Sequence, residues 1–468
     1  MFEMGSVRML SGPTLNPGWF GHPATTTIYL LALVNACIFV VGWGAGWWAG
    51  PKAFAAMIYQ DPSWVILPGR VAMVVFALWS IWLTWRLARQ IAGDRVGLAG
   101  AAIMAVNPVH IAYSQIIRSD IMATCFMLLV FLAAMRIARA DRGDPIRRDV
   151  ILAALWLALA TVTKWPFILS ALAVAGAMFL RLRDGRISVF DAIKALAAFG
   201  ALGIVFGVLV SPFLVLDFPT VVRNLAGERQ LHHLGATGGP PLSNAWWYVS
   251  GPMLRCLGAA GALLALPGAF LLARQREAAA TIAFAFVAFF LMICAQQLIW
   301  ERWVLPLAPT LAIAAAAGLV WVIEAVTKRA ADGVKRPVAA VVCAAVLLPM
   351  TAQAFVDARV RLNDTRQQAA AWAYANIRPG GSIMVEHFGF DLLQGPWRFL
   401  FPVGDSGCVD VRGLLTGKTQ YDQVEDARNQ RSNVDYGTLN PARRGTCAAD
   451  WAILTQADRY RAERATFP

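Results

Sequence analysis

The chain has 468 residues, of which 58% are hydrophobic and only 15% are charged. Its many apolar runs are long enough to cross about 30 Å of hydrocarbon, which excludes a soluble globular protein and predicts a multi-pass membrane protein. The formal net charge is +13, but this does not predict a nucleic-acid partner. The basic residues cluster in short links between the apolar runs, as the positive-inside rule expects of cytoplasmic loops.

Residues 1–65 form the first predicted region and contain the apolar segment 25–46. Nothing basic enough for a cytoplasmic loop lies at 47–65, so this segment either crosses from a cytoplasmic N-terminus or lies in the outer leaflet as a juxtamembrane element. The glycine-rich stretch GWGAGWWAG follows an apolar run without a strand–turn–helix context. We interpret it as close packing with interfacial tryptophans rather than as a phosphate-binding loop.

Residues 66–355 are predicted to form an all-α membrane core. The basic links at 86–95, 136–148, 181–186, 274–276 and 328–336 then fall on one side of the membrane. The links at Arg118 and Lys164, the stretch 217–253 and the pair Glu301–Arg302 fall on the other, outer side. Residues 150–163 and 165–182 are short for two spans and predict a helical hairpin broken at TKWP. The predicted spans lie near 66–88, 97–115, 120–138, 150–163, 165–182, 191–216, 254–273, 278–297, 303–326 and 337–355.

Residues 356–468 are mainly polar and predict a small outer-side α/β or α+β domain. GSIMVEHF and DWAILTQ are strand-like, and DTRQQAAAWAYANI predicts a helix with Asp364 as its N-cap. Cys408 and Cys447 are the two cysteines of this domain. They form either a disulfide, in an oxidising compartment, or two free thiols. The other five cysteines lie in apolar runs, where a thiol behaves as a small hydrophobic group.

Ionisable residues at membrane depth are candidates for function by default. Arg118 and Asp120 lie directly between two apolar runs, and the simpler interpretation is that they pair with each other. Lys164 lies at the break of the predicted hairpin, where the alternative is a snorkelling side chain. Asp217 follows SPFLVL, and its alternative role is to cap the next turn.

The remaining outer-side candidates lie later in the chain. Glu228, His232 and His233 belong to a Gly/Pro-rich stretch, and two adjacent histidines without further ligands do not predict a metal site. Glu301 and Arg302 precede WVLPLAP, and their alternative is an ordinary interfacial ion pair. Charges of both signs at the mouths of several helices predict a cavity for an anionic lipid headgroup. Cations would bind its phosphate, and a carboxylate would take a proton from an acceptor hydroxyl.

Six motifs occur in an order that resembles the GT-C membrane glycosyltransferases, in the branch of the protein O-mannosyltransferases and aminoarabinose transferases. The resemblance covers nearly the whole chain, although each motif is loose by itself. It implies a polyprenyl-phosphate sugar donor and no cofactor. It also implies transfer with inversion to a lipid, glycan or protein acceptor at the outer face of a bacterial inner membrane, and a periplasmic C-terminal domain. The motifs are GPTLNPGWFGHPATTTIYLLAL, HIAYSQIIRSD, ALATVTKWPFIL, SPFLVLDFP, ERWVLPLAP and AAAWAYANIRPGGSIMVE.

The resemblance also implies roles for single residues. Asp120 matches the second acidic position of the family and is the candidate catalytic residue. Arg118, Lys164 and Arg302 match basic positions that would neutralise the phosphate of the departing lipid. His22 begins a His-Pro-Pro-like turn in which this chain has alanine as the third residue, and it is grouped with Glu228, His232 and His233 as a candidate for the donor and acceptor loops.

The principal catalytic acid of the family lies in an Asp-Glu pair about a dozen residues before the glycine that matches Gly12. In this sequence the pair would fall upstream of Met1. Either the natural chain begins further upstream, or the protein lacks this base, for which Glu3, Asp61 and Glu228 are poor substitutes. In the second case the polypeptide as written is catalytically inactive.

Two other classes of function remain open. A transporter or flippase for an amphipathic anion would use the same charges as a translocation path, although these charges lie at one face and no inverted repeat is visible. A non-catalytic subunit that binds a polyprenyl phosphate would need the cations but no base. The sequence specifies neither the sugar nor the acceptor.

Overall fold

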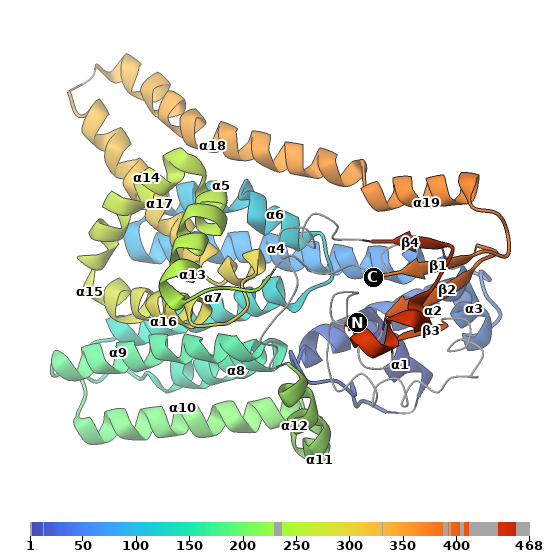
Figure 1. Ribbon diagram of the computed structural model, residues 1–468. Helices are drawn as coiled ribbons and strands as arrows, with labels where there is room; N and C mark the ends of the chain where they lie inside the picture. Colours follow the sequence, from blue (N-terminus) through green and yellow to red (C-terminus); the bar gives the residue numbers. More distant parts are fainter. Residues whose placement is uncertain are drawn as a thin grey trace. The chain divides into compact units, whose positions relative to one another are not determined.

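The computed structural model describes residues 2–12, 14–228, 236–329, 331–386, 392, 395–402, 407–410 and 439–454 (Figure 1). The chain divides into two compact units. The first comprises Met1–Val221, Pro240–Gln296 and Trp300–Asp357, and the second comprises Val222–Gly239, Gln297–Ile299 and Ala358–Pro468.

The first unit is a bundle of helices. Within the described residues, nine helices are long and apolar enough to cross a membrane, or ten if the bent pair α5–α6 counts as one span. This confirms the predicted all-α multi-pass domain. The helices are α1 (Phe2–Ser11), α2 (Thr25–Gly44), α3 (Pro51–Gln60), α4 (Ser63–Ala92), α5 (Asp94–Ala105), α6 (Pro108–Ser114), α7 (Ser119–Arg139), α8 (Arg147–Thr163), α9 (Ala171–Arg183), α10 (Val189–Val210), α11 (Phe213–Leu216), α12 (Phe218–Gly227), α13 (Pro241–Tyr248), α14 (Leu254–Ala273), α15 (Arg276–Ala278), α16 (Phe284–Cys294), α17 (Ala308–Thr327) and α18 (Asp332–Leu362).

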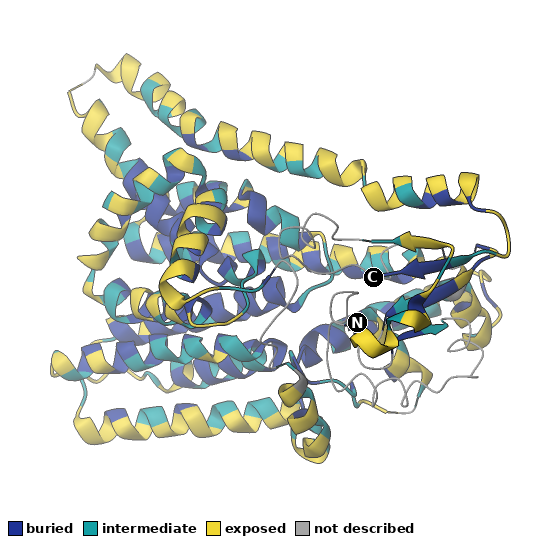
Figure 2. Ribbon diagram, in the orientation of Figure 1, coloured by how far each residue is buried: buried dark blue, intermediate teal, exposed yellow. Residues whose placement is uncertain are grey.

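Helix α7 is the centre of the bundle. Its most apolar window is 89% buried, because α4, α8 and α9 pack around it. Helix α10 is the opposite case, since only 6% of its window is buried and its main neighbour is α8. Figure 2 shows this contrast between a buried α7 and a largely exposed α10. An apolar helix that exposes most of its surface is expected to face lipid.

A proline follows each of two breaks between helices in the bundle. The run 97–115, predicted as one span, is bent by 58° between α5 and α6. Asn107 causes the break, since its side chain accepts hydrogen bonds from the backbone N–H of Val109 and His110, both at 3.0 Å, and Pro108 begins the next helix. The predicted break at TKWP is confirmed, because α8 ends at Thr163 and the 3₁₀ helix η1 (Trp165–Ser170) follows Lys164.

The stretch 217–253 differs from the prediction of a connecting loop. It contains α12 and α13, and α13 continues through the π-helical turn η2 (Val249–Met253) into α14. Pro241 is at the start of α13, where its missing N–H costs no hydrogen bond. Proline and glycine in this stretch thus begin helices as well as separate them.

Helices α14 and α17 are packed closely through two glycines. A Cβ at Gly268 would lie 1.8 Å from the carbonyl oxygen of Ala314, and a Cβ at Gly318 would lie 1.9 Å from that of Leu264. The two backbones therefore touch where neither residue has a side chain. Small residues at helix interfaces permit this close approach within membranes.

The second unit contains a four-stranded sheet of order β3-β2-β1-β4. Strand β1 (Ser382–Val385) pairs in parallel with β2 (Arg398–Pro402) and β4 (Trp451–Ile453), and β2 pairs antiparallel with β3 (Cys408–Asp410). The predicted strands in GSIMVEHF and DWAILTQ are β1 and β4, while β2 and β3 were not predicted. Helix α19 (Thr365–Asn376) contributes to the core around the buried Trp397, and Asp364 caps it as predicted.

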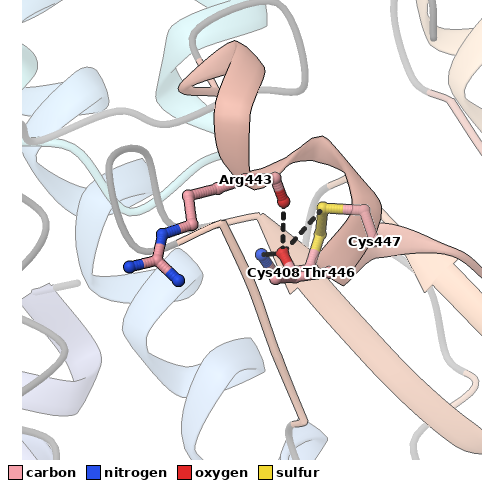
Figure 3. Close-up of a disulfide and its surroundings, with 4 residues drawn as sticks. All are labelled: Cys408, Arg443, Thr446 and Cys447. Carbon is pink, nitrogen blue, oxygen red and sulfur yellow. Dashed lines mark hydrogen bonds between the residues drawn. A yellow bond between two sulfur atoms is a disulfide. The ribbon is translucent and has the colours of Figure 1, made fainter.

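Cys408 and Cys447 form a disulfide, so the alternative of two free thiols is wrong. Figure 3 shows how Thr446 supports this disulfide. Its hydroxyl donates to the carbonyl of Arg443 at 2.6 Å and accepts from the backbone N–H of Cys408 at 2.8 Å. The bond joins β3 to the 3₁₀ helix η7 (Pro441–Cys447).

Candidate active site

The turn at residues 20–26 is bound to the break between α8 and η1. The backbone N–H of Ala24 donates to the carbonyl of Thr163 at 3.1 Å, and the hydroxyls of Thr26 and Thr163 lie 2.5 Å apart. The indole of Trp165 donates to the carbonyl of Phe20 at 3.2 Å. Residues far apart in sequence therefore fix His22 beside Lys164.

Ala24 explains why this turn lacks a second proline. Its backbone is in the left-handed region, with φ 47° and ψ 14°, whereas the proline ring holds φ near −65°. Proline would also remove the hydrogen bond to Thr163. The conformation of the turn therefore disfavours proline at position 24 in this chain.

The segment that carries His22 also contacts the residues that follow α10. The hydroxyl of Thr25 lies 2.9 Å from that of Ser211, and the amide of Asn16 donates to Asp217 at 2.8 Å. Capping of the next turn was the alternative role of Asp217, and the structure shows a long-range contact of its side chain with Asn16. Residues 16–25 are thus bound both to the α8 break and to the α10 end.

Asp120 and Lys164 form a buried ion pair. Asp120 lies in the first turn of α7 and is 2% exposed, and Lys164 is 7% exposed. Lys164 therefore does not snorkel, and Asp120 pairs with it rather than with the neighbouring Arg118. The extended backbone of Lys164 between two helices allows its side chain to reach the α7 terminus. Breaking such a pair leaves an uncompensated buried charge.

His22 lies in the field of the same charges. Burial, together with the positive charges of Lys164, Arg302 and Arg118, lowers the pKa of His22 to about 3, and Asp120 opposes this shift. The imidazole is consequently neutral at physiological pH and can accept or donate a hydrogen bond. Five residues predicted from the sequence are therefore brought to one place.

Arg302 completes the cationic side of the site. It lies on the 3₁₀ helix η4 (Glu301–Val304), is 9% exposed, and its guanidinium lies 4.2 Å from the ring centroid of Trp300. Burial and the charge of Arg118 lower the pKa of Arg302 to about 10. Arg302 remains charged at neutral pH, so three cationic groups surround Asp120.

Comparisons with known proteins show similarity in part of the sequence and in the fold. Residues 52–214, which include Arg118, Asp120 and Lys164, match the family described as dolichyl-phosphate-mannose-protein mannosyltransferase. The fold is similar to that of apo ArnT from Cupriavidus metallidurans, with 15% identity and a TM-score of 0.50 over 83% of this chain and 77% of ArnT. ArnT bound to undecaprenyl phosphate gives 14% identity and a TM-score of 0.52 over 85% and 80%. Part of the chain is thus similar in sequence to this mannosyltransferase family, and the fold is similar to that of ArnT. No curated protein matches the sequence.

Glu301 pairs with Arg255 rather than with Arg302, so the alternative of an ordinary ion pair between Glu301 and Arg302 is wrong. Arg255 in α14 donates to the carboxylate of Glu301 at 2.5 Å and to that of Asp357 at 2.5 Å. Gln353 donates to the other oxygen of Asp357 at 2.8 Å. Arg255 was not predicted as a site residue from the sequence, where it is marked only by its position inside an apolar run.

Glu3 is one of the three acids named in the sequence analysis as substitutes for the principal acid of the family. Its Oε1 accepts from the amide of Asn35 at 2.5 Å, and its Oε2 is buried without a hydrogen-bond partner in the structure. A Cβ at Gly69 would lie 3.2 Å from that Oε2 and 2.8 Å from Ile117. Burial raises the pKa of Glu3. Glu3 is therefore packed against α4, close to the chain that leads into Arg118.

Glu228, His232 and His233 are the remaining loop candidates from the sequence. Glu228 follows α12 and belongs to the second unit. His232 and His233 lie outside the described residues. No group of three potential metal ligands occurs among the residues that the structure describes.

Proposed function

We propose that this protein transfers a sugar from a polyprenyl-phosphate donor to a lipid, glycan or protein acceptor, with inversion. The reaction takes place at the outer face of a bacterial inner membrane. The observation that carries the proposal is a cluster in which buried Lys164 and Arg302, together with half-buried Arg118, surround the carboxylate of Asp120.

An excess of buried positive charge favours binding of an anion. Removing cations from water is costly, and a phosphate monoanion or dianion would restore the balance with charge-assisted hydrogen bonds. Arginine binds phosphate through a planar fork and lysine binds it as a point charge. One of the structures of similar fold, ArnT, holds undecaprenyl phosphate, which supports a lipid phosphate as the ligand here.

The same cations serve the chemical step. Negative charge grows on the phosphate as its bond to the sugar breaks, and fixed positive charges stabilise that transition state. Neutral His22 supplies a hydrogen-bonding group beside them. Asp120 orients Lys164 through the ion pair and, as the candidate catalytic acid of the sequence, contacts the acceptor hydroxyl.

A non-catalytic binder of a lipid phosphate is the second candidate. It is favoured by one observation, namely that the carboxylate of Asp120 is occupied by Lys164. A flippase is the third outcome and would move the lipid without breaking the sugar–phosphate bond.

The test uses purified protein in lipid nanodiscs with labelled polyprenyl-phosphate mannose and polyprenyl-phosphate aminoarabinose. Transferase activity releases free polyprenyl phosphate, whereas donor binding without release identifies a binder. Lys164→Ala should weaken donor binding, and Lys194→Ala on the exposed α10 is the matched control. Asp120→Asn should lower kcat. Movement of intact donor across vesicle membranes, without release, would replace the proposal by a flippase.

A further inference from the structure

Glu301 and Arg302 are consecutive residues with opposite charges at the edge of a buried site. Both residues lie on the short 3₁₀ helix η4, and an ion pair between them would cancel the charge that Arg302 contributes. The structure shows a different arrangement. Within the described residues, Arg302 has no carboxylate at ion-pair distance and lies over Trp300 at 4.2 Å.

Glu301 pairs with Arg255 instead of Arg302. One terminal nitrogen of Arg255 binds Glu301 and the other binds Asp357, each at 2.5 Å. A guanidinium presents its donors in a fixed planar fork, so the two carboxylates fix its orientation. The hydroxyl of Tyr113 also neighbours Glu301. The carboxylate of Glu301 is thus drawn toward α14 and α18.

These contacts have little exposure to solvent. The side chains of Arg255, Glu301 and Asp357 are 35%, 25% and 16% exposed. Charge interactions at such positions are screened less than at a fully exposed surface. A change in the partner of Glu301 would therefore change the electrostatic potential at Arg302, which is the next residue along the chain.

We propose that Arg255 is a positioning residue that withholds Glu301 from Arg302 and so leaves the positive charge of Arg302 uncompensated and available for the donor phosphate. This role rests on the proposed function of the site. Arg255 itself does not contact the phosphate. Its effect passes through Glu301, and this makes the role separable from that of a direct ligand.

The experiment measures the Kd of undecaprenyl phosphate for protein in nanodiscs, together with KM and kcat where transfer occurs. Arg255→Gln releases Glu301 and should raise Kd and KM by about ten- to a hundredfold. The double variant R255Q/E301Q removes the released carboxylate and should return Kd to within about threefold of the unmodified protein. Arg95→Gln is the matched control, since Arg95 pairs with Glu324 at the surface.

The outcomes separate this inference from the proposed function. If the unmodified protein binds the lipid phosphate and Arg255→Gln binds equally well, the positioning role is wrong and the site stands. If the double variant is as weak as Arg255→Gln, Arg255 is a direct ligand or a purely structural residue, and the inference is also overturned. If the unmodified protein does not bind, the proposed function fails, and this role of Arg255 fails with it. An unchanged thermal midpoint of R255Q/E301Q would show that the rescue acts in a folded protein.

Discussion

Gly268→Ala tests whether α14 and α17 pack backbone against backbone. The added Cβ would lie 1.8 Å from the carbonyl oxygen of Ala314 and 2.8 Å from the nitrogen of Gly318. Because contacts under 3.0 Å are essentially never observed, the helices must separate by at least roughly 1.2 Å. Overpacking costs about 1–3 kcal/mol, and a backbone oxygen cannot rotate away, so we expect the upper end of that range. Helix propensity returns at most about 1 kcal/mol.

The assay is thermal unfolding followed with a dye that becomes fluorescent when it reacts with thiols. Cys125 and Cys256 are fully buried and report on loss of the bundle. Gly200→Ala in α10 is the control, since no atom lies within 4 Å of its Cβ position, and it should leave the midpoint unchanged or raise it. In G268A/G318A the second substitution should cost less than the first, because the helices have already separated. Equal midpoints for Gly268→Ala and Gly200→Ala would refute the close packing.

The remaining predictions concern the turn, the buried acid and the disulfide. Ala24→Gly should stabilise the protein by up to about 1 kcal/mol by relieving the positive φ. Ala24→Pro should lower the thermal midpoint through loss of the hydrogen bond to Thr163. A higher thermal midpoint for Ala24→Pro than for Ala24→Gly would contradict the left-handed turn. Burial raises the pKa of Glu3, so its ionisation destabilises the folded state as pH rises through that raised pKa. The stability of Glu3→Gln relative to the unmodified protein should therefore increase from pH 4.5 to pH 8. A stability difference independent of pH would show that Glu3 does not titrate in this way. Cys447→Ser opens a loop of 39 residues and should destabilise the second unit by about 3–4 kcal/mol in the loop-entropy model; limited proteolysis should show the same change when the Cys408–Cys447 bond is reduced.

The site could largely be predicted from the sequence, because charged residues interrupt apolar runs at a cost that only function or pairing explains. His22, Arg118, Asp120, Lys164 and Arg302 were each singled out, and the structure brings them together. The pairing among them was not predictable. Asp120 has a neighbouring arginine two residues away, yet it pairs with a lysine 44 residues later, because the α8 break presents that lysine to the start of α7.

The contacts of Arg255 show the limit of reasoning from sequence. Its partners, Glu301 and Asp357, are 46 and 102 residues away, and nothing in an apolar run indicates which helix ends will meet. The same limit applies to prediction of the fold. Hydrophobic runs, a proline break and an Asp cap predicted local elements well, whereas the bend at Asn107 depends on side-chain hydrogen bonds that a hydropathy pattern does not contain.

The exposed helix α10 makes the surrounding bilayer part of the structure. Its 22 residues span about 33 Å, close to the thickness of a hydrocarbon core. Little of its apolar surface is covered by protein, so lipid is expected to cover the rest. The end of this helix leads into Ser211 and Asp217, which hold the segment that carries His22. A micelle of short-chain detergent that lets α10 tilt or detach would therefore disorganise the site without unfolding α7. We therefore expect acyl-chain length to affect the candidate site through this one helix, which has few protein neighbours.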